Sequence, residues 1–309
     1  MISKTRNNKK IVIIGGSGFI GSHVADVLSD AGFKVLIFDS QDSKWLRQDQ
    51  EMFIGDILKS EDLDKALKNT YAVFNFAGIA DIAEANANPL EAVKINILGT
   101  TLLLESCVKQ KVKKFIFASS LYIYSESGGI YSSTKQACEL LIEDYSKNQG
   151  LEFSILRFGS LYGNRANDFN PIRKLISQAF IDGVMTREGL GEEIRDYIHV
   201  KDAASCCLTI LEEKKNQYFM ITGSQTIKIK DLLTMIQEML SNKVEVSYEE
   251  VIDQSHYIVS PFTFKPRIAK KINLKMSCDL GQGILDTIHE VYEDLQNDPE
   301  IEINTKIFE

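Results

Sequence analysis

The chain has 309 residues, 44% of them hydrophobic and 25% charged, which is the composition of a globular protein long enough for two unequal domains. Its formal net charge of -8 provides no basic face, so we expect no nucleic-acid partner. The apolar run after the basic start, residues 11–14, is too short for a signal peptide, and no later run approaches the roughly 20 apolar residues of a membrane span, so we expect no membrane partner.

Short apolar runs alternate with segments of helical periodicity up to about residue 160. The runs of strand character occupy 11–14, 35–38, 52–54, 72–76, 115–118 and 153–157. Helices are predicted over 19–31, 63–67, 90–109 and 132–146. Because the strands are continuously apolar and separated by helices, the pattern predicts an α/β fold with a Rossmann-like, doubly wound parallel sheet covered on both faces.

The signals become shorter and less regular after residue 161. Four helix- and strand-breaking residues predict loops here: Pro171, Gly183, Gly189 and Gly191. The remaining signals are helices over 199–213, 232–240 and 284–295 and a strand over 218–222. We therefore expect a first domain of residues 1–160, to which 199–222 returns, and a smaller second domain from 161–198 and 223–309. A substrate is expected in the cleft between two such domains.

The sequence GGSGFIG joins the first predicted strand to the first predicted helix. Gly15 permits a tight turn, Gly18 lets the backbone approach a pyrophosphate, and Gly21 lets the helix pack closely. Phe19 and Ile20 form the start of the predicted helix. The free N–H groups of this first turn and the helix dipole favour a phosphate. Because a strand precedes it and a helix follows, the motif indicates a dinucleotide site, with a purely structural turn as the alternative.

The second predicted strand ends in Asp39, at the distance from the glycines that dinucleotide-binding folds use. A carboxylate at this position accepts hydrogen bonds from the adenosine ribose and repels a 2′-phosphate. No arginine or lysine follows it immediately. The sequence therefore favours NAD over NADP as the cofactor.

Tyr131 and Lys135 lie four residues apart at the start of a predicted helix, which places both side chains on one face. A tyrosine hydroxyl is a poor base, with an unperturbed pKa of about 10. A neighbouring ammonium and an oxidised nicotinamide favour the phenolate. Ser120 ends the preceding strand, where it should point into the cofactor crevice and hold the same substrate oxygen. Alone, such a pair on a helix is ordinary surface chemistry.

These motifs, taken in order, resemble an extended short-chain dehydrogenase/reductase of the nucleotide-sugar epimerase and dehydratase group. The resemblance also rests on further segments: Gly55-Asp56-Ile57, Phe76-Ala77-Gly78, Asn96, Ser119-Ser120 followed by Tyr124, YSSTK at 131–135, Leu156-Arg157 with Leu161-Tyr162-Gly163, and RDYIHV at 195–200. They extend from about residue 10 to 212, and the remaining residues match only loosely.

The resemblance implies a role for each matched position in cofactor binding or catalysis. Cofactor contacts are implied for Asp56 and Ile57 at the adenine and for Ala77 and Gly78 on the way to the nicotinamide, while Asn96 braces the active-site strands. Catalysis is implied for Ser120, Tyr131 and Lys135, and Tyr131 and Lys135 also contact the cofactor.

Substrate contacts are implied for Ser120, Ser160 and Arg195. The guanidinium of Arg195 suits the substrate diphosphate, because it is planar and permanently charged. Its alternative is a surface salt bridge with Glu192 or Glu193. Ser160 stands where the family usually carries an asparagine.

Several positions depart from the family pattern. Leu121-Tyr122 replaces the Asp-Glu pair that many sugar dehydratases use at carbons 5 and 6. Ala80 replaces a lysine of many 4-epimerases, and the loop over 125–130 is shorter than in relatives. The carboxylates left nearby are Glu84 and Glu126, of which Glu126 has doubtful reach.

The resulting hypothesis is an NAD-dependent nucleotide-sugar epimerase that acts at carbon 4 through a transient keto sugar. Its first domain binds NAD, and its smaller C-terminal domain binds a nucleoside-diphosphate sugar. The alternatives are a nucleotide-sugar oxidase or ketoreductase, a 4,6-dehydratase, and a non-catalytic dinucleotide-binding regulator. The intact Ser120, Tyr131 and Lys135 argue against the regulator.

The cysteines and two helices complete the expectations. No metal-ligand spacing occurs among the five cysteines, and adjacent Cys206 and Cys207 suit a disulfide poorly, so we expect reduced thiols, no metal and a cytoplasmic protein. In relatives, the helices matching 90–109 and 132–146 pair across a twofold axis. Here these helices carry apolar residues on more than one face: Leu98, Leu102, Leu103, Leu140 and Leu141. We expect a homodimer, with coverage of the sheet alone as the alternative.

Overall fold

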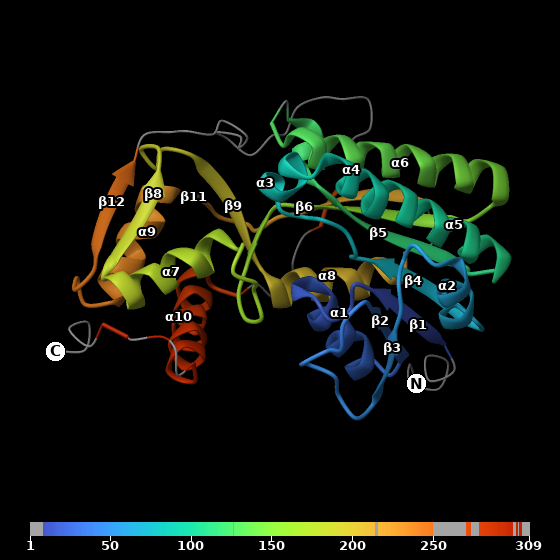
Figure 1. The fold of residues 1–309 in the computed structure, drawn as a ribbon, viewed down its shortest axis with the longest axis horizontal. Helices are drawn as coiled ribbons and strands as arrows, with labels where there is room; N and C mark the ends of the chain where they lie inside the picture. The colour runs from blue at the N-terminus through green and yellow to red at the C-terminus, as the bar shows by residue number, and fades with distance from the viewer. Residues whose placement is uncertain are drawn as a thin grey trace. The chain divides into compact units, whose positions relative to one another are not determined.

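The computed structural model describes residues 9–125, 127–213, 216–249, 270–272, 278–298, 301 and 303–304 (Figure 1). The chain divides into two compact units. The first comprises Met1–Phe158, Ala203–Ile221 and Phe262–Asn273, and the second comprises Gly159–Asp202, Thr222–Pro261 and Leu274–Glu309. Glu126, a carboxylate considered from the sequence, lies outside the described residues.

A parallel sheet forms the centre of the first unit. Its eight strands within the described residues are β1 (Lys10–Ile14), β2 (Lys34–Asp39), β3 (Gln50–Ile54), β4 (Thr70–Asn75), β5 (Lys114–Ser120), β6 (Glu152–Phe158), β10 (Gln217–Ile221) and β13 (Lys270–Lys271). They are ordered β13-β10-β6-β5-β4-β1-β2-β3, with every pairing parallel. The predicted Rossmann-like sheet is confirmed. The order reverses between β1 and β4, and α/β sheets bind ligands at such a switch point.

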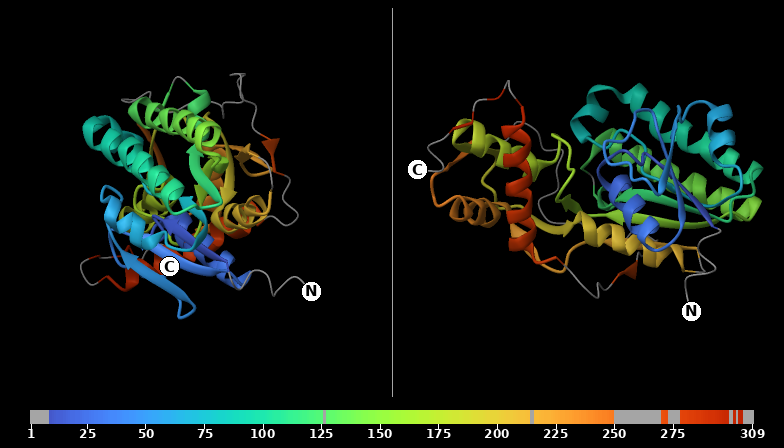
Figure 2. Two further views of the ribbon diagram at one scale, coloured as in Figure 1. Left: turned by 90° about the vertical axis from the view of Figure 1, so that its right-hand side faces the viewer. Right: turned by 90° about the horizontal axis from the view of Figure 1, so that it is seen from below.

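Helices cover both faces of this sheet. The helices of the first unit include α1 (Phe19–Asp30), α2 (Ser60–Ala66), α5 (Thr100–Lys109) and α6 (Gly129–Gln149), while α8 (Val200–Leu211) begins in the second unit. Figures 1 and 2 show α5 and α6 on one face and α1 and α8 on the other. Leu103 of α5 and Cys138 of α6 belong to the same buried apolar cluster as Val12 and Phe117 of the strands.

The predicted helix over 90–109 is divided in three. It consists of α4 (Pro89–Ala92), a π-helical segment η1 (Val93–Gly99) and α5. A short helix α3 (Ile82–Ala87) precedes it, and a 3₁₀ turn η2 (Leu121–Tyr124) follows β5. The helix predicted from residue 132 begins earlier, at Gly129, so Tyr131 lies inside its first turn.

The second unit contains the two helices predicted over 232–240 and 284–295, and also one helix and several strands in segments for which neither was predicted. Its strands are β7 (Ser160–Tyr162), β9 (Ile194–His199) and β11 (Thr226–Lys228) in one sheet, and β8 (Val184–Glu188) with β12 (Glu245–Glu249) in another. Its helices are α7 (Pro171–Asp182), α9 (Ile229–Met239) and α10 (Leu280–Gln296). Pro171 is the first residue of α7, and Gly183 is its C-cap, with φ of +71°. The two residues therefore mark the ends of a helix and do not prevent one from forming.

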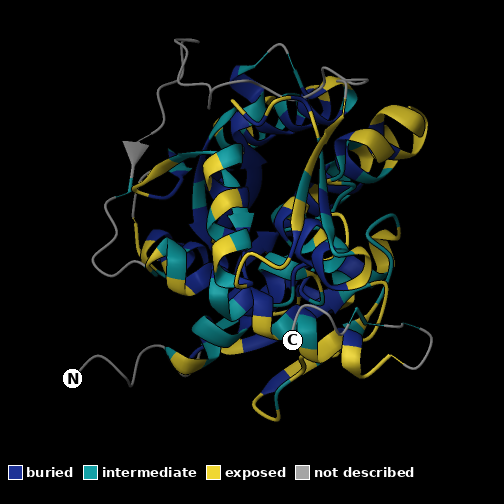
Figure 3. Cartoon of the chain, turned by 90° about the vertical axis from the view of Figure 1, so that its left-hand side faces the viewer, coloured by how far each residue is buried: buried dark blue, intermediate teal, exposed yellow. Residues whose placement is uncertain are grey.

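The three helices that the described residues of the second unit form each bury one face in a shared apolar core. Ile176 of α7, Leu232 of α9 and Ile288 of α10 all belong to it. In Figure 3 the helices alternate between buried and exposed stretches, as amphipathic helices do. None of the helices formed by the described residues is both long and apolar enough to span a membrane.

Candidate active site

The glycine segment forms the turn between β1 and α1. Gly15 has φ of +76°, and a Cβ there would lie 2.6 Å from the backbone nitrogen of Ala77. A Cβ on Gly21 would lie 2.2 Å from the Gly15 carbonyl oxygen, so a side chain would force α1 away from the turn. Among the described residues, a Cβ on Gly18 would meet only that same oxygen, at 3.4 Å. The surface over Gly18 is therefore open to a ligand.

The first turn of α1 suits a pyrophosphate. Gly18 is the N-cap and provides no side chain to accept from the free N–H groups of Phe19 and Ile20, and the first turn has no acidic residue. Free N–H groups and the positive end of the helix dipole both favour an anion. The residues present at this turn thus fit the phosphates of a dinucleotide.

Asp39 lies at the carboxyl end of β2, beside the glycine turn. Its carboxylate accepts hydrogen bonds from the backbone N–H of Ser17 at 3.0 Å and of Gln41 at 3.3 Å. The next arginine along the chain, Arg47, is paired with Asp30 at 2.7 Å and with Asp49 at 2.8 Å. Its guanidinium is therefore already engaged by carboxylates, which fits a ribose without a 2′-phosphate.

Asp56 and Ile57 follow the neighbouring strand β3. The N–H of Gly55 donates to the Asp39 carbonyl at 2.8 Å, so the ends of β2 and β3 lie together. The Asp56 carboxylate accepts from the N–H of Leu58 at 2.9 Å, which fixes the turn before α2. Ile57 is half-buried and packs against the core under α5. This arrangement is compatible with the adenine contact that the family implies.

Asn96 ties the segment after β4 to helix α6. Its side-chain oxygen accepts from the N–H of Ile79 at 2.8 Å, and its amide donates to the Ile79 carbonyl at 3.1 Å and to Thr134 at 3.0 Å. Gly78 is close by, because a Cβ there would lie 2.7 Å from the same Asn96 oxygen. Asn96 thus braces a loop and a helix, where the family resemblance implied strands.

Tyr131 and Lys135 occupy successive turns of α6, next to the end of β5. The Lys135 ammonium donates to the Ala118 carbonyl at 2.9 Å and lies 5.8 Å from the centre of the Tyr131 ring. Ser120 ends β5, and its hydroxyl oxygen accepts from the N–H of Tyr122 at 3.2 Å. All three predicted catalytic side chains are buried.

The environment of Lys135 affects its pKa in two directions. Burial lowers the pKa, because it disfavours the charged form. The nearby side chains of Cys138 and Glu139 act against this and raise it. The positive charge that would stabilise a Tyr131 phenolate therefore depends on neighbours of Lys135 on α6.

The positions after Ser120 contain no carboxylate. Leu121 is buried and packs with Ile123 and Tyr124. Tyr122 lies edge-on to Tyr131, with ring centroids 6.3 Å apart, and its carbonyl accepts from the Ser132 hydroxyl at 2.9 Å. The acid–base pair of sugar dehydratases has no counterpart at these two positions.

Sequence reasoning missed Asn86 of α3, whose side chain contacts the start of α6, the helix that carries Tyr131. Its side-chain oxygen accepts from the N–H of Ile130 at 3.0 Å. Gly128 and Gly129 precede this turn with φ of +94° and +48°, and a Cβ on Gly129 would lie 2.3 Å from the Asn86 oxygen. Asn86 thus caps α6 from outside, and the two successive glycines were the available signal.

Ser160 and Arg195 belong to the second unit. Ser160 of β7 pairs with Tyr197 of β9, two residues from Arg195, so the three side chains share one face of this sheet. Glu192 is bound to Lys228 at 2.7 Å, and Glu193 to Arg187 at 3.0 Å. Both glutamates thus have other cationic partners, and Arg195 is only 6% exposed, so neither observation favours the considered alternative of a surface salt bridge.

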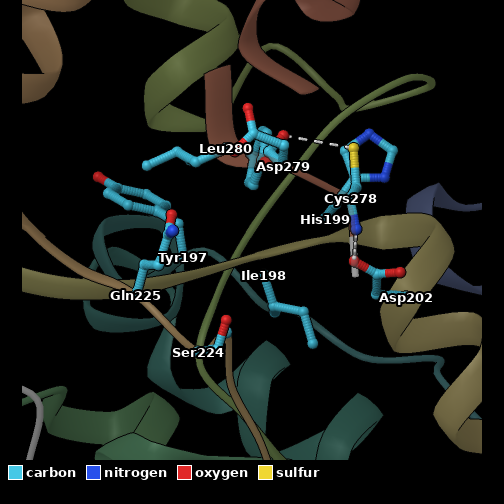
Figure 4. A pocket seen from close by; sticks show the side chains of 11 residues that line it. Tyr197, Ile198, His199, Asp202, Ser224, Gln225, Cys278, Asp279 and Leu280 are labelled. Carbon is cyan, nitrogen blue, oxygen red and sulfur yellow. Dashed lines mark hydrogen bonds between the residues drawn. The ribbon is translucent and has the colours of Figure 1, made fainter. Parts of the chain in front are cut away.

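A small polar pocket of about 140 Å³ lies in the second unit (Figure 4). It is lined by residues of β9, of the loop after β10 and of the start of α10, including Tyr197, Gln225 and Asp279. The N–H of Cys278 donates to the Asp202 carboxylate at 2.7 Å. Burial raises the pKa of Tyr162, which also contributes to the lining. The pocket shares strand β9 with Arg195.

Residues 11–221 match the model of a family described as NAD dependent epimerase/dehydratase. A putative UDP-glucose 4-epimerase from Methanocaldococcus jannaschii is 27% identical, over 89% of this chain and 95% of that protein. A UDP-N-acetyl-alpha-D-glucosaminuronate decarboxylase from Bacillus cytotoxicus is also 27% identical, over 94% and 99%. The crystal structure of a UDP-glucose 4-epimerase from Thermotoga maritima with UDP-glucose superimposes with a TM-score of 0.81 at 25% identity, over 93% and 99%.

Proposed function

Because this chain belongs to the NAD dependent epimerase/dehydratase family, we propose that it is a nucleotide-sugar epimerase that acts at carbon 4 through a transient keto sugar. The observation that carries the proposal is the grouping of Ser120, Tyr131 and Lys135 at the end of β5, with no carboxylate at 121 or 122. Such a group can exchange the proton of a hydroxyl, but it provides no acid to expel water.

NAD is the cofactor of this family. In our proposal, the glycine turn from Gly15 to Gly21 and the start of α1 hold its pyrophosphate, and Asp39 binds the adenosine ribose. Asp56 and Ile57 contact the adenine. Ala77 and Gly78 line the way to the nicotinamide, and Tyr131 and Lys135 bind the adjoining ribose.

The proton chemistry falls to three side chains. Tyr131, as the phenolate, takes the proton from the hydroxyl at carbon 4 and later returns it. Ser120 donates a hydrogen bond to the same oxygen, and the Lys135 ammonium stabilises the phenolate. When bound, NAD supplies the reversible hydride exchange at that carbon. Return of the hydrogen to the other face of the keto sugar inverts the centre.

The substrate is a nucleoside-diphosphate sugar. Relatives from Methanocaldococcus jannaschii and Thermotoga maritima carry UDP-glucose in their names. Arg195 is nearly fully buried on β9, and its guanidinium can bind a diphosphate through two parallel hydrogen bonds. Ser160 shares its face of the sheet and contributes a hydroxyl.

The same proposal includes a homodimer in the cytoplasm. The described cysteines are all free thiols, four of them buried, which suits a reducing compartment. Leu98 and Leu140 are apolar yet about half exposed, on the helices that form the dimer in relatives. Burying them against a second copy would remove this surface from water.

The test is product analysis with NAD and uridine-, thymidine-, cytidine- and guanosine-diphosphate sugars. We expect a product of unchanged mass with an inverted carbon 4 in proton NMR. Loss of two hydrogens with released NADH would instead identify an oxidase. A product lighter by one water, with a new methyl signal, would refute the proposal, because dehydration needs chemistry that Leu121 and Tyr122 do not provide.

A further inference from the structure

A buried ion pair lies one helical turn beyond Lys135. Arg157 of β6 binds Glu139 of α6 with both ends of its fork, from Nε to Oε1 at 3.0 Å and from Nη2 to Oε2 at 2.6 Å. The Ser119 hydroxyl donates to the same Glu139 Oε1 at 2.6 Å. Arg157 is 2% exposed and Glu139 3%, so neither charge is offset by water.

Arg157 is fixed on its other sides by two aromatic residues. Its Nη1 donates to the hydroxyl of Tyr124, and its guanidinium lies 4.7 Å from the ring centres of Tyr124 and Tyr218. Tyr124 belongs to η2, the turn that directly follows Ser120. The pair therefore connects β6, α6, β5 and η2 through charge-assisted bonds, which have stricter geometry than apolar packing.

The residues of this ion pair and its hydrogen-bond partners lie close along the chain to the proposed catalytic residues. Glu139 follows Lys135 by four residues, so both side chains lie on one face of α6. Ser119 is the residue before Ser120, and Tyr124 closes the turn after it. The same pair thus restrains the helix of Tyr131 and Lys135 and the strand end of Ser120.

We propose that the Glu139–Arg157 pair is a positioning element of the reaction, which holds α6 against β5 and η2 so that Lys135, Tyr131 and Ser120 stay aligned. This inference rests on the proposed function. Glu139 and Arg157 do not touch the substrate; they act through the three residues that do. The misplacement of reacting groups by about 1 Å can cost on the order of 100-fold in rate.

Glu139 also acts on the charge of Lys135. Cys138 and Glu139 are the titratable groups of α6 that raise the pKa of Lys135 against the effect of burial, while β5 contributes the Ala118 carbonyl and the Phe117 ring. Tyr131 lies eight residues from Glu139, about 12 Å along the helix, so Glu139 affects it mainly through Lys135. Loss of Glu139 therefore lowers the pKa of Lys135 further. A less protonated Lys135 provides less of the positive charge that lowers the pKa of Tyr131.

The experiment compares the wild type with three variants. Glu139→Gln removes one charge and can fail to fold, because it leaves Arg157 buried without a counter-charge. The double variant Glu139→Gln with Arg157→Met removes both charges and keeps much of the volume. Asp144→Asn is the matched control, the same carboxylate-to-amide change at an exposed position of α6.

Two readouts are measured on folded protein. The first is kcat and KM for the nucleotide sugar, with NAD affinity by calorimetry. The second is the tyrosinate absorbance of Tyr131 in the NAD complex as a function of pH, identified by subtracting the same titration of the Tyr131→Phe background. The second readout needs no sugar, so it remains informative if the proposed function fails.

In the double variant we expect kcat to fall on the order of 100-fold. KM should stay near the wild-type value, because Arg195 lies on another element. NAD affinity should fall much less than kcat, because the glycine turn and Asp39 keep their contacts with the cofactor. The Tyr131 titration should move to higher pH, and Asp144→Asn should change neither readout. A wild-type kcat in the double variant, or an unshifted Tyr131 titration, overturns the proposal and leaves the pair a purely structural role. A wild type without turnover refutes the epimerase, and the titration then decides alone.

Discussion

The proposed role of Lys135 requires a charged ammonium at a buried position, where the charged form is disfavoured. Burial lowers its pKa, and the Ala118 carbonyl together with Glu139 offsets part of that cost. A fully solvated lysine would hold its proton more firmly, but its field would be screened by water. A buried ammonium therefore stabilises a nearby phenolate more strongly, provided that its neighbours keep it protonated.

The substitution Tyr131→Phe tests the proton transfer directly. It removes only the ionisable oxygen from a side chain that is 9% exposed, so the fold and NAD binding should persist. We expect turnover to fall by about 10²–10⁴-fold, the usual contribution of a general base. Steady-state rates and NAD calorimetry on the same preparation measure both quantities. Near-wild-type turnover would assign the base to another residue.

Lys135→Ala, by contrast, should damage both NAD affinity and rate.

Asp39 sets the expected preference between the two dinucleotides. A buried ribose hydrogen bond to a carboxylate is worth about 1.5–3 kcal/mol, which corresponds to roughly 10–100-fold in affinity. We therefore expect NAD to bind at least about tenfold more tightly than NADP. In Asp39→Ala this ratio should shrink, mostly through weaker NAD binding. Calorimetry with both dinucleotides is the measurement, and equal affinities in the wild type would contradict the assignment.

At the scale of elements, local patterns predicted what local chemistry decides. The glycine turn could be predicted because Gly15 and Gly21 meet steric limits imposed by their own neighbours. The central strands could be predicted because parallel strands buried on both faces must be apolar along their length. Helix α7 was missed because Pro171 and Gly183 were interpreted as breaks, although a proline at the first turn and a glycine at the end are the usual limits of a helix.

The rest of the site depends on contacts distant in sequence. Asn86 caps α6 across 44 residues, and Ser119 reaches Glu139 across 20. Hydrophobic periodicity does not predict such hydrogen-bond partners, because each of these residues alone is a common polar side chain. The π-helical segment around Asn96 was also beyond prediction, because the apolar pattern of an α-helix continues through it.

For the whole molecule, the exposed leucines predict the assembly. Leu98 is 47% exposed and Leu140 51%, whereas Leu103 on the same pair of helices is fully buried against the sheet. Covering the sheet therefore accounts for Leu103 but leaves Leu98 and Leu140 unexplained. We expect a homodimer by light scattering, which becomes a monomer in the Leu98→Glu, Leu140→Glu double variant.

The matched control is Leu190→Glu, because Leu190 is an exposed leucine of the second unit, 78% accessible, and lies on neither helix. This variant should remain dimeric. A monomeric wild type at micromolar concentration would show that the exposed leucines have no partner of their own kind.

The strand order also dictates a sequence of events on the ribosome. β10 pairs with β6, but residues 159–216 separate them in the chain, including the first part of the second unit. Synthesis at about 5–20 residues per second takes several seconds to cross this interval. Throughout that time β6 is an open edge of an otherwise apolar sheet, able to pair with any passing strand. The nascent chain is therefore most exposed to aggregation after Phe158 has emerged and before Ile221 has, and holding factors on the ribosome would act in that window.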